Sequence, residues 1–262
     1  MERVSYQGGN LGDFLWLTPL AKYIPDLVIE MRKGDKRSES VSKIFDGLAD
    51  VEFVENPSPT RKTNDKIHIT QKILNAYGVF GKNSIPKILL TDDEIKTAKK
   101  LLKSFKNPIA IINNNSGTND PLNYRARYVC PPHEFMQEIC DHFIKNGRDV
   151  IQFGPSSNYY DRDTFVPLNG ATYIRGLSVR ELAACYFVIG QMISGDTGDY
   201  HLMLAVGGEC VTLVPHESLH LGYIYSDLLY GYANDDWIGE MPRCTYINHE
   251  LYKTIINERI FL

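Results

Sequence analysis

The stretch from Ser194 to His201, with the sequence Ser-Gly-Asp-Thr-Gly-Asp-Tyr-His, combines small residues with side chains suited to binding sugars or phosphates. Residues 183–193 are mostly apolar and predict the end of a helix that runs into a short buried strand. Residues 201–206, which are apolar after His201, predict the first turns of a helix. A helix start binds phosphate through its backbone N–H groups and its dipole. The stretch is therefore predicted to be an anion-binding turn.

Glycines cluster near the N-terminus at Gly8, Gly9 and Gly12, directly before Asp13. Glycines let the backbone turn sharply and approach a ligand. Their spacing is not the G-x-G-x-x-G pattern of dinucleotide sites, so such a site is not indicated. Asp13 falls in the first turn of the next expected helix, where negative charge suits the dipole. For this loop alone, a purely structural carboxylate is the simpler interpretation.

Strands and helices alternate along the chain, which predicts parallel sheets covered on both faces. Short apolar runs predict strands at 3–7, 27–31, 51–54, 109–112 and 149–153, in the run that ends at 193, and at 210–215. Helical spacing and two capping boxes predict helices over 14–23, 40–48, 67–77, 95–105 and 132–146, and from 178 onward. These elements would position the two polar turns.

Three of the predicted strands end in polar turns, after Ile112, Phe153 and Ile193. Ligands bind outside the carboxyl ends of the strands in open parallel sheets. We therefore expect these turns to converge on one crevice. The segment 84–87 is the best candidate for the start of a connector between two domains.

The composition limits the function classes. A formal net charge of −4 argues against a general polyanion binder, so nucleic acid is not an expected partner. The five cysteines form no C-x-x-C pair, which disfavours a zinc site or a disulfide framework. The N-terminus lacks a signal-peptide core and no stretch is long and apolar enough to cross a bilayer, so a cytoplasmic location is expected.

Together these motifs resemble glycosyltransferase family 9, the ADP-heptose heptosyltransferases. The resemblance rests on Gly12-Asp13-Phe14-Leu15 with Thr18-Pro19-Leu20, and on Asp196-Thr197-Gly198 followed by His201. It extends to the helix at 67–77, the capped helix after 90–94 and the helix from 178 to 185.

The resemblance implies an α/β protein of GT-B architecture, in which two Rossmann-like domains with parallel sheets face each other across a cleft. The family is usually longer, so the N-terminal domain is expected to be reduced. The implied parts are an acceptor-side domain at 1–106, a nucleotide-sugar-binding domain at 107–245, and a C-terminal helix within 246–262 that returns to the first domain.

The family's motifs also imply roles for single residues. Asp13 corresponds to the base that deprotonates the acceptor hydroxyl, opposite the donor and beside the glycine-rich loop. The implied donor-binding residues are Ser116, Thr118, Arg127, Gly154, Asp196, Thr197, Gly198 and His201. Arg127, or Arg125, would place a guanidinium on the phosphates, with a surface ion pair as the alternative. Asp196 would hold a sugar hydroxyl or organise the turn, because an ionised carboxylate only accepts hydrogen bonds.

The implied function is that of an inverting, metal-independent glycosyltransferase. It would use a nucleotide-diphosphate sugar and a hydroxyl acceptor on a glycan, a lipid-linked saccharide or a protein, with membrane contact only through the acceptor. Asp161 and Asp163 match a metal-binding D-x-D pattern, but the match is short and we treat it as coincidence. No metal or cofactor is therefore expected. Two alternatives are a non-catalytic nucleotide-sugar-binding or scaffold protein and a GT-B-type sugar-nucleotide epimerase.

Overall fold

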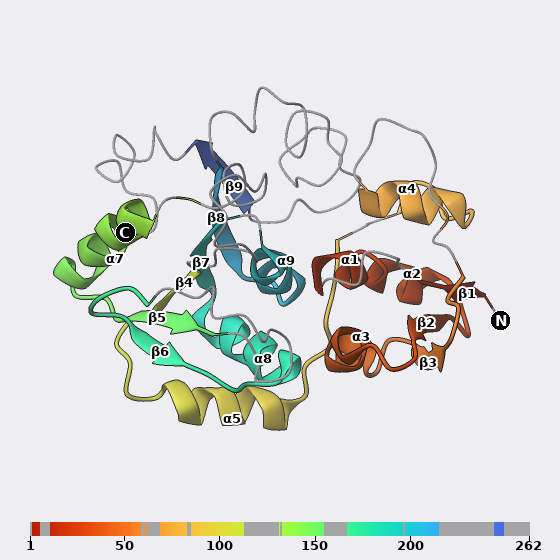
Figure 1. Ribbon diagram of the computed structural model, residues 1–262, viewed down its shortest axis with the longest axis horizontal. Coiled ribbons are helices and arrows are strands. Elements are labelled where there is room, and N and C mark those ends of the chain that lie inside the picture. The colour runs from red at the N-terminus through yellow and green to blue at the C-terminus, as the bar shows by residue number, and fades with distance from the viewer. Residues whose placement is uncertain are drawn as a thin grey trace.

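Two parallel β-sheets organise the protein, and they lie at opposite ends of the view in Figure 1. The computed structural model describes residues 2–5, 11–58, 61, 69–82, 85–112, 131, 133–154, 167–195, 197–214 and 244–248. Within these residues, the N-terminal sheet has three strands and the C-terminal sheet has six. The alternation of strands and helices predicted from the sequence is confirmed.

The N-terminal sheet has the order β1-β2-β3, formed by β1 (Arg3–Val4), β2 (Val28–Arg32) and β3 (Asp50–Val54). Its pairings are parallel, with Val4 opposite Ile29 and Ile29 opposite Val51. Val28, Ile29 and Met31 of β2 are buried, as expected for a strand covered on both faces.

The helices of the N-terminal part differ in detail from the prediction. The helix expected over 14–23 is two helices, α1 (Leu11–Leu15) and α2 (Thr18–Tyr23), separated at 16–17. Pro19 lies in the first turn of α2, where its missing N–H costs nothing. The helix expected over 40–48 starts earlier and is divided between α3 (Lys36–Val41) and the 3-10 helix η1 (Ser42–Phe45). The helix expected at 67–77 is α4 (Ile69–Ala76).

The C-terminal sheet has the order β6-β5-β4-β7-β8-β9, and all its pairings are parallel. Its strands are β4 (Ile109–Ile112), β5 (Val150–Phe153), β6 (Thr172–Ile174), β7 (Gln191–Ser194), β8 (Glu209–Val214) and β9 (Cys244–Asn248). Numbered from β4, this is the 3-2-1-4-5-6 order of a doubly wound dinucleotide-binding fold. The C-terminal helix expected within 246–262 does not include 246–248, which form the end of β9, and residues 249–262 lie outside the described part.

The helices that cover the C-terminal sheet are α5 (Asp92–Leu102), α7 (His133–Lys145), α8 (Val179–Ile189) and α9 (Gly198–Ala205). Both predicted capping boxes are present. The Glu94 N–H donates to Thr91 Oγ1 at 3.3 Å, and the Thr91 N–H donates to the Glu94 carboxylate at 2.8 Å. Helix α8 ends at Gly190, whose φ of 74° is the left-handed conformation that favours glycine at this position.

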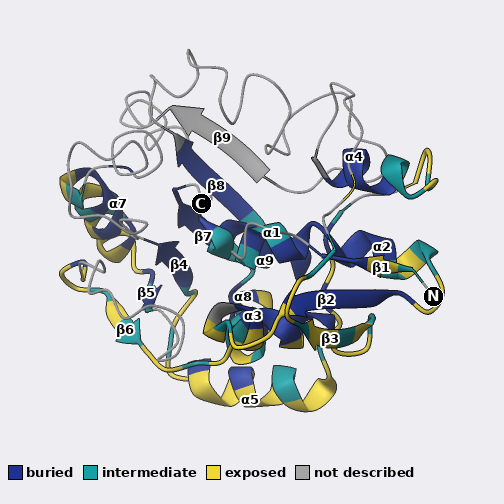
Figure 2. Cartoon of the chain, turned by 45° about the vertical axis from the view of Figure 1, so that its right-hand side comes forward, coloured by how far each residue is buried: buried dark blue, intermediate teal, exposed yellow. Residues whose placement is uncertain are grey.

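Among the described residues, the buried core that joins the two sheets lies on one side of the C-terminal sheet. Alternate strand residues such as Ala110 and Ile112 pack, with α8 and α9, into the same apolar cluster as α1 and β2. Their neighbours Ile109 and Ile111 point to the other face, where α7 closes a separate cluster. Figure 2 shows β4, β7 and β8 buried and the outer face of α5 exposed. The α8–α9 face of the C-terminal sheet is therefore the face that meets the N-terminal sheet.

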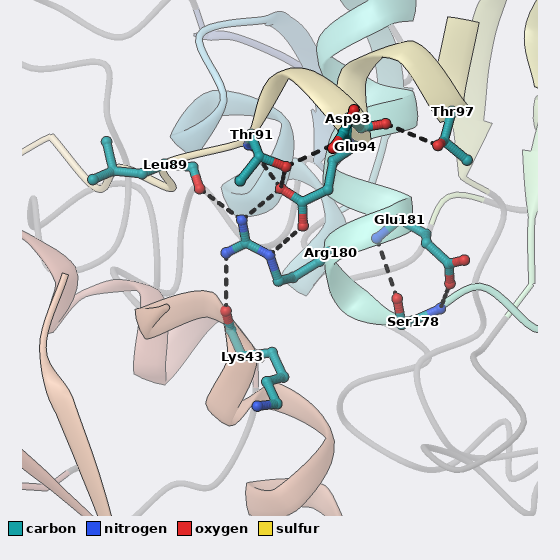
Figure 3. A network of polar contacts seen from close by, with 9 residues as sticks. All are labelled: Lys43, Leu89, Thr91, Asp93, Glu94, Thr97, Ser178, Arg180 and Glu181. Carbon is teal, nitrogen blue, oxygen red and sulfur yellow. Dashed lines mark hydrogen bonds and ion pairs between the residues drawn. The ribbon is translucent and has the colours of Figure 1, made fainter. Parts of the chain in front are cut away.

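A polar contact joins the two parts at the far end of α8 (Figure 3). The Arg180 guanidinium donates to Glu94 Oε1 at 2.5 Å and Oε2 at 2.7 Å, to the Leu89 carbonyl at 2.7 Å, and to the Lys43 carbonyl at 3.1 Å. It holds the pKa of Glu94 down, to about 2. We call Arg180, Glu94, Leu89 and Lys43 the arginine junction. It connects α8, the cap of α5, the connector and η1.

Candidate functional site

The order of the C-terminal sheet places its switch point between β4 and β7. From β4 the chain adds β5 and β6 on one side, and it then adds β7, β8 and β9 on the other. Ile112, the last residue of β4, lies opposite Ser194, the last residue of β7. Ligands of such sheets bind outside the carboxyl ends of the strands at this point. The three polar turns predicted to converge follow β5, β4 and β7, which are adjacent strands.

The turn from β7 to α9 is held by its own side chains. Ser194 is fully buried, and its hydroxyl donates to the Gly195 carbonyl at 2.8 Å and lies 3.0 Å from Thr197 Oγ1. Thr197 is the N-cap of α9 in an extended conformation, and its side chain makes no capping hydrogen bond. Helix α9 begins at Gly198, three residues before the predicted start. The Thr-Gly pair therefore stands at the positive end of a helix, as the anion-binding prediction requires.

A hydrogen-bonded pair, a buried tyrosine and a partly buried aspartate, lies at this helix start. The Tyr186 hydroxyl, on α8, donates to Asp199 Oδ1 at 2.7 Å. Burial raises the pKa of Asp199, whereas hydrogen bonds from Tyr186, from its own backbone N–H and from Thr197 lower it. Burial, reinforced by the Asp199 charge, raises the pKa of Tyr186 well above its ordinary value. The pair ties the start of α9 to α8 and keeps the tyrosine a hydrogen-bond donor.

The other side of the site comes from the N-terminal part, because α1 packs against α9. A Cβ atom on Gly198 would lie 3.1 Å from Leu11 Cβ and 3.5 Å from the Gly12 backbone nitrogen. A Cβ atom on Gly12 would lie 2.8 Å from His201 Cδ2. Two glycines, one from each predicted motif, thus allow the two backbones to approach closely.

Two aromatic rings hold His201 in this contact. The His201 ring packs edge-on against Trp16, with 5.6 Å between centroids, and lies against the Tyr200 ring at 3.9 Å. His201 and Trp16 are only 4% and 5% exposed, so the contact is closed to solvent. We call Leu11, Gly12, Trp16, Gly198 and His201 the glycine junction.

The predicted site residues are distributed as follows. Asp13 lies in the first turn of α1, partly buried, and belongs to the segment that packs on α9. Gly154 ends β5, where its N–H donates to the Ile174 carbonyl at 2.9 Å, and a Cβ there would overlap the Tyr173 ring. The structure brings Gly12, Gly198 and His201 into contact, and Asp13 and Thr197 are the chain neighbours of Gly12 and Gly198. The remaining predicted residues lie outside the described part: Gly8, Gly9, Ser116, Thr118, Arg127 and Asp196.

Sequence reasoning missed Trp16, Tyr186 and Asp199. Trp16 lies four residues after Gly12, the spacing of one helical turn, and this was a usable signal. Tyr186 and Asp199 are thirteen residues apart on different helices, so no local pattern pairs them.

The described residues also bear on metal binding and on membrane insertion. In the part of the chain that the structure describes, no three His, Cys, Asp or Glu side chains gather as a metal site would need. Asp161 and Asp163 are outside that part. Among the same described residues, no helix has the length and apolar character needed to cross a membrane.

Comparison with known proteins supports the fold. No protein-family model and no curated protein sequence matches the chain. A solved structure of a glycosyl transferase family 9 protein from Veillonella parvula is similar over 100% of this chain and 92% of that one, with a TM-score of 0.63 and 15% identity. Escherichia coli ADP-heptose lps heptosyltransferase II is similar over 98% of both chains, with a TM-score of 0.58 and 11% identity.

A third neighbour is E. coli heptosyltransferase WaaC with ADP-2-deoxy-2-fluoro heptose, at a TM-score of 0.51 and 12% identity, covering 98% of this chain and 99% of that one. These likenesses confirm the predicted α/β fold with parallel sheets, of the GT-B kind. They also confirm, at the level of the fold, the resemblance to glycosyltransferase family 9 that the motifs indicated.

Proposed function

We propose that this protein is a glycosyltransferase that moves a sugar from a nucleotide-diphosphate sugar to a hydroxyl acceptor. One observation carries the proposal: the helix start at Thr197 and Gly198 lies at the switch point of a doubly wound sheet, and Gly198 packs directly against Leu11 and Gly12 of α1, next to Asp13 in the chain. A helix start at the switch point suits a diphosphate, and the contact with α1 brings the Asp13 carboxylate from the opposite side. The named activities of the structural neighbours support the same reaction class.

On the donor side, the proposal assigns the diphosphate to the backbone N–H groups at the start of α9. Asp196, Thr197 and Gly198 form this part of the site, with His201 one helical turn further along α9 and with Gly154 directly after β5. Ser116, Thr118 and Arg127 belong to the segment that follows β4, the strand next to β7. Arg127 supplies a planar fork of donors that matches phosphate oxygens.

On the acceptor side, Asp13 acts as the base. It takes the proton of the acceptor hydroxyl while that oxygen forms a bond to the anomeric carbon of the sugar. The bond from that carbon to the phosphate oxygen breaks, and the nucleotide diphosphate leaves with the electron pair. A single displacement of this kind inverts the anomeric configuration. The helix dipole and the guanidinium stabilise the leaving diphosphate, so the proposed reaction uses no metal and no cofactor.

The proposed domain organisation assigns acceptor activation and donor binding to different parts of the chain. Residues 1–106 form the acceptor-side domain with the loop of Gly8, Gly9 and Gly12, residues 107–245 bind the donor, and 246–262 return toward the first domain. The acceptor is a hydroxyl of a glycan, a lipid-linked saccharide or a protein. ADP-heptose is the first donor to try, because ligands of that type occupy a structural neighbour.

The test compares Asp13→Asn with Asp92→Asn, which makes the same change in the first turn of α5. Transfer is followed as release of ADP from ADP-heptose and related sugars with candidate acceptors, and donor binding by calorimetry. We expect Asp13→Asn to lower transfer about 10²- to 10⁴-fold while ADP binding survives, and Asp92→Asn to change neither. Undiminished transfer by Asp13→Asn would remove it from the mechanism.

The wild-type protein separates the other candidate functions in the same assay. Saturable binding without transfer to any acceptor identifies a non-catalytic nucleotide-sugar binder. A changed sugar nucleotide formed from donor alone identifies an epimerase.

A further inference from the structure

Two residues that contact His201, Gly12 in α1 and Trp16 directly after α1, stand on either side of Asp13 in the chain. Gly12 precedes it, and Trp16 lies one helical turn after Gly12, with its backbone N–H donating to the Gly12 carbonyl at 3.2 Å. The His201 ring approaches the Cα of Gly12 so closely that a Cβ there would be 2.8 Å from it. The same ring packs edge-on against Trp16. One imidazole therefore contacts both ends of the turn that carries the proposed base.

His201 is equally well placed relative to the donor turn. It lies on α9, three residues after Gly198, and the Gly198 Cα itself is close to Leu11 and Gly12. With the Tyr200 ring 3.9 Å from it between centroids and only 4% of its surface exposed, the ring has little freedom to move. A shift of α1 relative to α9 must therefore displace the His201 ring or open the contact.

We propose that His201 is a positioning residue for sugar transfer: its ring, seated between Gly12 and Trp16, fixes Asp13 relative to the donor turn at 196–198. This inference rests on the proposed function and specifies how His201 contributes to the site. Its physical reason is the steep dependence of the reaction on geometry, since a misplacement of 1 Å costs about 10²-fold in rate. The missing Cβ of Gly12 is what allows the ring to sit there.

The test is a double-mutant cycle of Gly12→Ala, His201→Ala and the double variant, measured in transfer rate and in urea unfolding. In the wild-type background the new Cβ meets the ring, so Gly12→Ala is expected to lower kcat about 10²-fold and to lower stability. In the His201→Ala background the ring is gone, so the same substitution is expected to cost little in either measurement. This non-additivity is the signature of a direct contact.

Two further measurements separate positioning from ligand binding. The affinity for ADP, measured by calorimetry, is expected to be the same in Gly12→Ala and the wild type, so that the loss appears in kcat. His201→Phe, which keeps a flat ring against Trp16 but lacks the imidazole nitrogens, is expected to retain more transfer than His201→Ala. His142→Ala on α7 is the matched control and is expected to leave transfer unchanged.

The proposal is overturned if Gly12→Ala has the same effect on transfer with and without the His201 ring. It is also overturned if His201→Phe and His201→Ala lose transfer and ADP affinity equally, because the imidazole then binds the donor directly. If the wild type transfers no sugar, the proposed function fails and the positioning role fails with it. The unfolding cycle still reports whether the contact exists, so the two failures are distinguishable.

Discussion

Among the described residues, two junctions between the N-terminal and C-terminal parts are built on opposite principles. The glycine junction depends on shape, because Gly12 and Gly198 have no side chain and the Trp16 and His201 rings pack there. The arginine junction is specified by charge and hydrogen bonding, through four bonds from one guanidinium. The first lies beside the proposed reaction and the second at the far end of α8. The comparison suggests that one junction sets catalytic geometry and the other sets the stability of the assembly.

This contrast predicts that a larger side chain in the glycine junction has its greatest effect on the rate of sugar transfer. Gly198→Val places a branched side chain where a single Cβ would already be 3.1 Å from Leu11. We expect transfer to fall about 10²-fold or more, because α1 is pushed away from α9. Overpacking should also cost about 1–3 kcal/mol of unfolding free energy. Steady-state kinetics and urea unfolding check this, and a fully active Gly198→Val protein would show that the contact is not required.

Removing the Arg180 guanidinium should affect stability more than sugar transfer. Arg180→Met keeps the length of the side chain but leaves Glu94 and the Lys43 and Leu89 carbonyls without this donor. We expect a loss of about 2 kcal/mol, or roughly 4–8 °C in the midpoint of thermal unfolding. Transfer by the folded protein should change far less than in Gly198→Val. Lys99→Met on the exposed face of α5 is the control, and equal unfolding midpoints for the two variants would contradict the role assigned to Arg180.

The arginine junction should also be the junction that responds to acid. The pKa of Glu94 in the folded protein is about 2, below its ordinary value of 4.5. The unfolded chain therefore binds this proton more readily, and stability from the pair is present above pH 4.5 and lost as the pH falls toward 2. Glu94→Gln should reduce the acid sensitivity of the unfolding midpoint between pH 5 and pH 3. An unchanged pH profile would show that other carboxylates dominate acid unfolding.

The α/β fold class and the positions of the two polar turns were predictable from the sequence, because both depend on local residue patterns. Short apolar runs identified the described strands other than β6 and β9, and two capping boxes identified helix starts that the structure retains. The break between α1 and α2 was missed, because helical spacing continues through Trp16 and the break shows only in the backbone. β9 was also missed, since Cys244–Asn248 follows a long aromatic segment that masks the strand signal.

The candidate site was predictable only in its parts. The sequence placed Gly12 and Gly198 in separate turns, each with its own local explanation. That the two glycines meet, and that His201 fills the space beside Gly12, depends on how two sheets pack across more than 180 residues. The same holds for the hydrogen bond from Tyr186 to Asp199. Long-range contacts of this kind leave no periodic signal in a single sequence.

The central claim is that the turn after β7 and the segment 11–16 form one nucleotide-sugar site. Hydrogen exchange of the wild-type protein, with and without saturating ADP, tests this claim directly, because exchange reports protection along the backbone. We predict that ADP slows exchange in peptides covering 195–201 and 11–16, while peptides of β2 and β3 are unchanged. ADP binding that leaves both segments unprotected, or no detectable ADP binding, would contradict the account.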